Sequence, residues 1–209
     1  MTRWLAMAAR LRSAAKRGDL AALRAALVTG VDVDARNAGG KTALHYAALR
    51  RKTACLEALL AAGASVHSMD NYGDTPLHNA SYDGRVACVR ALIAAGADVN
   101  RTDRYGNTPF SRALDQGYRR VLKILFRAGA EVNAENVARR PTGRYHFIRG
   151  NDAAWALVDE IRAAGGWQNY VTLRRAALVR AISDAVRGKF PDVINLEIAT
   201  YVEPPGGYD

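Results

Sequence analysis

One interval of 33 residues constrains the fold of this chain more than any other feature. The segment Thr42-Ala-Leu-His45 recurs as Thr75-Pro-Leu-His78 and again as Thr108-Pro-Phe-Ser111. Glycines keep the same interval at Gly40, Gly73 and Gly106, and again at Gly63, Gly96 and Gly129. A fixed period of this length indicates stacked supersecondary units, because no single unit can bury its apolar side alone. We therefore predict a solenoid built from copies of one motif.

The residues in each repeated segment predict two helices per unit. Thr42, Thr75 and Thr108 can cap the first helix, because a hydroxyl accepts a hydrogen bond from an unpaired backbone N–H. Pro76 and Pro109 follow at the first helical position, where no backbone donor is needed. The second helix has apolar residues at helical spacing, at Cys55, Leu56, Leu59 and Leu60, at Cys88, Val89, Leu92 and Ile93, and at Leu122, Ile124, Leu125 and Phe126. A glycine then ends it.

Together, these markers resemble the ankyrin repeat. The resemblance implies an all-α ankyrin-repeat solenoid with β-hairpin turns and a C-terminal helical cap. It also implies a protein-binding array without catalytic activity. We predict an N-terminal capping repeat at 1–36, repeats at 37–69, 70–102 and 103–135, a degenerate closing repeat at 136–168, and a C-terminal helical element at 169–209.

One position departs from the repeat pattern. Gly18, Gly84 and Gly117 stand in phase between the two helices of their units, but the second repeat has Arg51 at this place. A turn that suits glycine strains a residue with a side chain. We therefore expect either backbone strain or a different turn at Arg51.

The segment 189–202 resembles the opening helix of an F-box. Its matching residues are Phe190, Pro191, Ile194, Ile198, Tyr201 and Val202. Too few residues follow for a complete box, so the resemblance implies a truncated F-box after an ankyrin array, similar to the PRANC arrangement. In that case Phe190, Pro191, Ile194, Ile198 and Tyr201 would dock a cullin adaptor subunit. An amphipathic helix that caps the array explains the same residues.

A SOCS-type box is a further alternative for the C-terminal element. Thr172-Leu173 with Ala177 and Ala181 is similar to the first helix of that box. However, Ala177 stands where the box has cysteine.

Charge and composition argue against two classes of partner. The net charge is +10, but the excess is spread along the chain and no Lys/Arg run exceeds three residues, at Arg50-Arg-Lys52. Aromatic residues are not interleaved with the basic ones as stacking platforms, so we do not expect direct nucleic-acid binding. No apolar run approaches the roughly 18 residues of a membrane span. We expect a monomer that binds protein and has no membrane segment.

The two cysteines, Cys55 and Cys88, hold equivalent inward positions one repeat apart. Stacked helices lie about 8 to 10 Å apart, whereas a disulfide tolerates a Cα separation of about 7 Å. We predict two buried, reduced thiols, which suit the cytoplasm or the nucleus.

No catalytic, cofactor or metal site is predicted. His45 and His78 belong to the repeated motif, and His67 and His146 have no cysteine or carboxylate partners at metal-ligand spacing. The glycines fall at turns and do not form a phosphate loop.

Function in such arrays resides on the concave surface made by the hairpin tips and the first helices. By phase, the predicted exposed positions there are Lys41, Leu49, Arg50, Asn71, Tyr72, Asp74, Tyr82, Asp83, Arg104, Tyr105, Asn107, Asp115 and Gln116. Tyrosine and arginine dominate binding energy at protein interfaces. We predict a partner protein with a short basic and aromatic, or amphipathic, segment. The alternative function is that of a substrate adaptor for a cullin-type ubiquitin ligase.

Asn100 and Asn133 add one smaller hypothesis. With Leu92 and Leu125 at matching distances before them, they resemble ankyrin asparagines that a dioxygenase hydroxylates. The alternative is that they are turn asparagines that bond backbone groups.

Overall fold

The structure is a computed structural model that describes residues 2–131, 151–165, 168–174 and 176–177. The chain forms two compact units, residues 1–157 and 158–209. The first unit contains nearly all the described residues.

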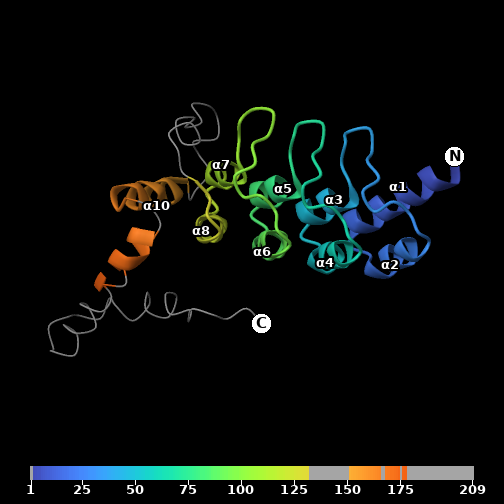
Figure 1. Cartoon of the computed structure of the whole chain (residues 1–209), viewed down its shortest axis with the longest axis horizontal. Coiled ribbons are helices and arrows are strands. Elements are labelled where there is room, and N and C mark those ends of the chain that lie inside the picture. Colours follow the sequence, from blue (N-terminus) through green and yellow to red (C-terminus); the bar gives the residue numbers. More distant parts are fainter. Residues whose placement is uncertain (1, 132–150, 166–167, 175, 178–209) are drawn as a thin grey trace. The chain divides into compact units, whose positions relative to one another are not determined.

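Helices in the first unit come in pairs, and like members of successive pairs pack together in two layers (Figure 1). The first helices of the pairs are α1 (Thr2–Arg17), α3 (Ala43–Leu49), α5 (Pro76–Tyr82) and α7 (Pro109–Asp115). The second helices are α2 (Leu20–Val28), α4 (Thr53–Ala61), α6 (Val86–Ala94) and α8 (Arg119–Arg127). The predicted repeats therefore stack as expected from their period.

The first helices start where the threonines predicted. Thr42, Thr75 and Thr108 are the N-cap residues of α3, α5 and α7, in extended backbone conformation, and each takes part in a capping box with the residue three positions later. Pro76 and Pro109 are the first residues of α5 and α7. The start of each first helix is thus determined by residues of its own repeat.

Two buried histidines then connect neighbouring repeats. The Thr42 N–H donates to His45 Nδ1 at 3.2 Å, and His45 Nε2 donates to the backbone oxygen of Asp74 at 3.0 Å. His78 makes the equivalent contacts one repeat later, also at 3.2 and 3.0 Å. The carbonyl can only accept, so the proton is on Nε2. Burial lowers the pKa of His45 to about 4 and also lowers that of His78. Both imidazoles are therefore neutral at pH 7.

The loops that precede α3, α5 and α7, here called fingers (residues 36–41, 69–74 and 102–107), are organised by one side chain each. The Oδ1 atoms of Asn37, Asp70 and Asp103 accept from the N–H groups two and four residues later. In the described part of the chain these loops contain turns but no β-strand, so the predicted β-hairpins are not confirmed.

Backbone bonds connect each finger to the next. The N–H of Asn71 donates to the oxygen of Gly39, and the N–H of Arg104 donates to the oxygen of Tyr72, both at 3.0 Å. This close approach, together with the left-handed φ of 81° at Gly73, leaves no room for a side chain there, because a Cβ would lie 2.8 Å from the Arg104 nitrogen. Glycine is therefore required at this turn.

The core of the first unit consists of leucines in phase between the two layers, with Phe110 and Phe126 in edge-to-face contact at 4.7 Å at its C-terminal end. Cys55 and Cys88 are buried and free in this core, as predicted. Burial raises the pKa of both thiols. Arg51 has a left-handed φ of 57°, which confirms that its backbone is strained where the other repeats have glycine.

The C-terminal predictions lie largely outside the described residues. A helix, α10 (Asn151–Ala163), is present where the second helix of the closing repeat was predicted. Residues 168–174 and 176–177 are helical, and Tyr170 is buried. The F-box-like residues Phe190, Pro191, Ile194, Ile198 and Tyr201 fall outside the described ranges, so the C-terminal cap stays a prediction.

Candidate functional site

The predicted binding residues are less uniformly exposed than the sequence suggested. The exposed members are Arg50, Asn71, Tyr72, Tyr82, Arg104 and Tyr105. The half-buried members are Lys41, Leu49, Asp74, Asp83, Asn107, Asp115 and Gln116. The prediction that all of them are exposed is therefore wrong, because several of these side chains bond to other parts of the array.

These residues divide into a finger group and a helix-end group. Tyr72, Arg104 and Tyr105 lie on the fingers, whereas Leu49, Tyr82 and Asp115 are the last residues of α3, α5 and α7. Each of these helices has seven residues, which separates its two ends by about 10 Å. The neighbouring Asp83 pairs with Arg85 at 3.0 Å beyond the end of α5, and this ion pair accounts for its partial burial.

Arg112, on α7, joins the two groups, and the sequence analysis missed it. Its Nη2 lies 2.6 Å from Asp103 Oδ2 and 3.2 Å from Asp74 Oδ1. Its guanidinium carbon lies 5.9 Å from the centroid of the Tyr82 ring. One arginine thus connects the third finger, the second finger and the end of α5. Its contact with the Tyr82 ring is a cation–π interaction.

A repeated position could have revealed this arginine. Tyr46, Asn79 and Arg112 are the fourth residues of α3, α5 and α7, one period apart. Tyr46 accepts a hydrogen bond from the Asn37 amide at 2.9 Å, and the buried Asn79 amide nitrogen has no hydrogen-bond partner among the described residues. Polar side chains that change from repeat to repeat at one in-phase position are the sequence signal of a surface that faces the fingers.

The carboxylates of this region have shifted pKa values. Burial alone would raise the pKa of Asp103, but hydrogen bonds from Asn107 and Tyr105 and the charge of Arg112 lower it below its ordinary value. Burial raises the pKa of Asp74 despite the nearby Arg112. Burial also raises the pKa of Asp115, to about 6, and Arg112 opposes this shift. Asp74 and Asp115 would both be stabilised by additional positive charge.

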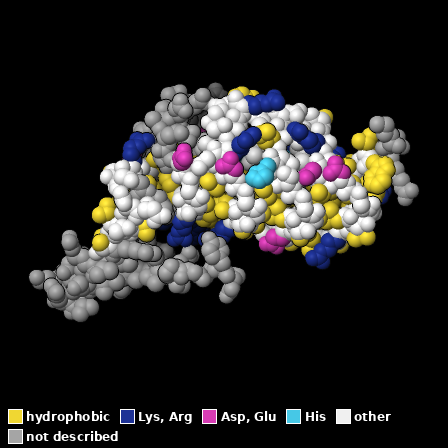
Figure 2. Space-filling model, viewed as in Figure 1, with side chains coloured by type: hydrophobic (Ala, Val, Ile, Leu, Met, Phe, Trp, Pro, Cys, Tyr) yellow, Lys and Arg dark blue, Asp and Glu magenta, His cyan; other side chains and the backbone are white. Residues whose placement is uncertain are grey.

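Charge elsewhere on the array is mixed. On the face of the repeats seen in Figure 2, Lys and Arg side chains are interspersed with Asp and Glu. Within the described ranges, no group of three His, Cys, Asp or Glu side chains could hold a metal ion. No helix in those ranges is both long enough and apolar enough to cross a membrane.

Comparison with known families settles the nature of the array. The sequence profile of a family described as ankyrin repeats (3 copies) matches residues 11–103 and again residues 53–136. This chain belongs to the ankyrin repeat family. A comparison with curated proteins returned no match. Ankyrin repeats are generally non-catalytic modules for protein–protein interaction.

Asn100 is part of the connection between ankyrin repeats. Its side-chain nitrogen donates to the oxygen of Gly129 at 3.1 Å, and its Oδ1 accepts from the N–H of Glu131 at 2.9 Å. These are the bonds expected of a turn asparagine that satisfies backbone groups. Asn133, its counterpart, lies outside the described residues.

Proposed function

We propose that the concave surface of the ankyrin array binds a short basic and aromatic segment of a partner protein. The observation that carries the proposal is a row of exposed tyrosines on the fingers and on α5. Tyr72, Tyr82 and Tyr105 are exposed to 56%, 43% and 57%. Tyrosine is frequent among residues that dominate interface energy, because its ring offers a large contact area and its hydroxyl a hydrogen bond.

The surroundings of the tyrosines support the chemical class of the partner. Asp74 and Asp115 are half-buried carboxylates with raised pKa values, and Arg112 compensates them only in part. A lysine or arginine from a partner would stabilise their charged forms, because an opposite charge nearby favours ionisation. The finger backbones are already hydrogen-bonded to one another, which lowers the ordering cost of binding.

Affinity purification with mass spectrometry tests this proposal. The full chain is compared with Y72S/Y105S, which removes two exposed rings, and with W4S as the control. Trp4 lies on α1 and is exposed to 61%, so W4S removes a similarly exposed ring that belongs neither to the fingers nor to α5. We expect partners that W4S retains and Y72S/Y105S loses. An identical partner list for all three chains would refute a concave binding surface.

The adaptor function predicted from the sequence is tested separately. It rests on the F-box-like residues 190–202, and the family match ends at residue 136. A chain truncated after Gly188 should lose a cullin adaptor subunit while it keeps the partners of the concave surface. If the truncated chain remains folded and its partner list is unchanged, the residues after 188 have no docking role.

A further inference from the structure

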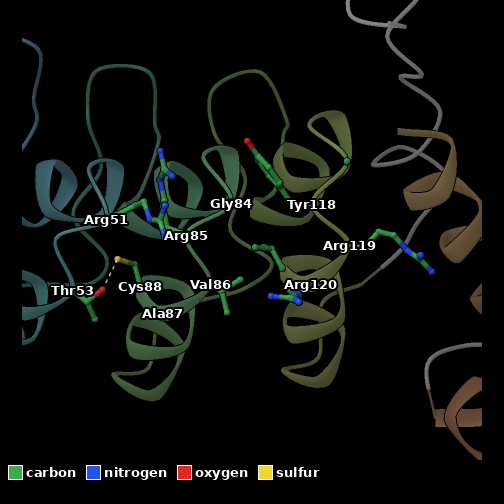
Figure 3. Close-up of a pocket in the computed structure, with 12 residues that line it drawn as sticks. Arg51, Thr53, Gly84, Arg85, Val86, Ala87, Cys88, Tyr118, Arg119 and Arg120 are labelled. Carbon is green, nitrogen blue, oxygen red and sulfur yellow. Dashed lines mark hydrogen bonds between the residues drawn. The ribbon is translucent and has the colours of Figure 1, made fainter. Parts of the chain in front are cut away.

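A second surface lies at the opposite end of the first helices from the fingers, along the loops that join each first helix to its second helix. A pocket of about 700 Å³ opens there across the second, third and fourth repeats. Its charged lining residues are Arg51, Arg85, Arg119 and Arg120, shown with their neighbours in Figure 3. We refer to it as the loop pocket.

The loop pocket has more positive charge than negative charge around it. None of its lining residues is acidic. Arg85 pairs with Asp83 at 3.0 Å, but its buried Nε has no hydrogen-bond partner within the described ranges. Arg51, Arg119 and Arg120 form no ion pair with any described residue. The arginine-rich lining therefore favours an anionic ligand.

The helices around the pocket add to this charge imbalance. In the first repeat, the N-cap Asp19 accepts from the Ala22 N–H at 2.9 Å. The N-cap residues of α4, α6 and α8 are Lys52, Arg85 and Tyr118, none of which caps its helix through the side chain, and the first turns contain no acidic residue. A helix N-terminus carries partial positive charge, so basic residues there are unfavourable. If stability alone were selected, we would expect capping residues such as Asp19 at the N-termini of α4, α6 and α8.

We propose that the loop pocket binds an acidic peptide segment of a partner protein in extended conformation, with its carboxylates on the arginines of successive repeats. Stacked helices lie about 10 Å apart, which corresponds to about one turn of an extended polyproline II helix, in which every third side chain lies on the same side. Acidic residues at every third position would therefore meet Arg51, Arg85 and Arg119 in turn.

The rest of the lining favours a peptide over a nucleic acid. Val86 and Ala87 offer apolar surface between the arginines, where side chains between the acidic residues can pack. Tyr118 is the one aromatic residue among the lining residues, all of which are described. Its ring covers Gly84, where an added Cβ would lie 2.7 Å from Tyr118 Cδ1. Single-stranded nucleic acid instead requires a series of stacking platforms.

Fluorescence anisotropy with synthetic peptides tests the proposal. The probe is a labelled peptide of about twelve residues with glutamate at every third position. One comparison peptide has glutamine in place of glutamate, and another has the same composition with adjacent glutamates. The full chain should bind the spaced probe most tightly. R119Q/R120Q should weaken binding by about tenfold or more. R24Q/R90Q removes the same charge from exposed arginines outside the pocket and should leave affinity within about twofold.

A second variant separates binding from folding. R119E/R120E places acidic residues in the first turn of α8 and should raise the urea midpoint while it abolishes probe binding. Equal loss of affinity in R119Q/R120Q and R24Q/R90Q would overturn the proposal, because it would show attraction by bulk charge only. Equal affinity for all three peptides would also overturn it. Tighter binding of an unlabelled oligothymidylate that displaces the probe would identify a nucleic-acid surface instead.

Discussion

Replacing His45 with serine copies a solution that the fourth repeat already uses. Ser111 occupies the equivalent position, where its hydroxyl accepts from the Thr108 N–H at 3.0 Å. H45S can therefore keep the capping contact within its own repeat. It loses the bond from Nε2 to the Asp74 oxygen and part of the buried volume, and at pH 7 we expect this to lower the free energy of unfolding by about 2 kcal/mol.

The effect of H45S should change with pH. Burial lowers the pKa of His45 from 6.5 to about 4. Above pH 6.5 the imidazole is neutral in both states and its contribution is complete. Between pH 6.5 and about 4 the unfolded chain takes up a proton that the folded chain excludes, so that contribution is lost as pH falls. At about 1.4 kcal/mol for each tenfold change in the protonation constant, the loss amounts to about 3 kcal/mol.

Urea denaturation at a series of pH values measures this effect as the difference between wild type and H45S. The wild type should be more stable at pH 7, the two curves should cross near about pH 5, and H45S should be more stable at about pH 4. H67S, which removes an exposed histidine, controls for the change in charge. A difference between wild type and H45S that is constant over this pH range would refute the conclusion that His45 is buried as a neutral imidazole.

Three further predictions concern the loops and the core. R51G should raise the free energy of unfolding by about 0.5 to 1 kcal/mol, because it relieves the strain at a φ of 57°. G84A should lower the free energy of unfolding by about 2 kcal/mol, because its Cβ would lie 2.7 Å from the Tyr118 ring. Urea denaturation measures both variants, and effects of the opposite sign would contradict the assigned backbone. Cys55 and Cys88, both 1% exposed, should react with iodoacetamide in urea but not in the folded chain, as mass spectrometry can show. Rapid labelling of the folded protein would contradict their burial.

The features that the sequence predicts well are those encoded within one repeat. Thr75 and Pro76 start α5 by local hydrogen bonding and by a fixed φ, whatever the neighbouring repeats contain. The left-handed backbone at Arg51 follows from its alignment with Gly18 and Gly84. Cys55 and Cys88 are buried because they lie on the apolar side of their helices, and that side packs into the core. Periodicity is sufficient for all of these.

The features that the sequence analysis missed depend on contacts between residues of different repeats. Arg112 could not be selected from its own helix, because its partners Asp74 and Asp103 belong to two different fingers. Asp83 was assigned to the concave surface by phase alone, whereas its bond to Arg85 makes it part of the loops on the other side. The loop pocket was missed for the same reason. Its arginines are spread over three repeats, and the basic run at Arg50-Arg-Lys52 supplies only one of them.

The hydrogen-bonded fingers have a consequence for how such a protein can evolve. Tyr72 and Arg104 join the row of fingers through backbone atoms, while both side chains are exposed. Substitution at these two positions therefore changes the chemistry offered to a partner without removing a bond that holds the row together. Lineages can exchange one partner for another by single mutations at the tips, while the backbone bonds and the buried histidines keep the architecture constant.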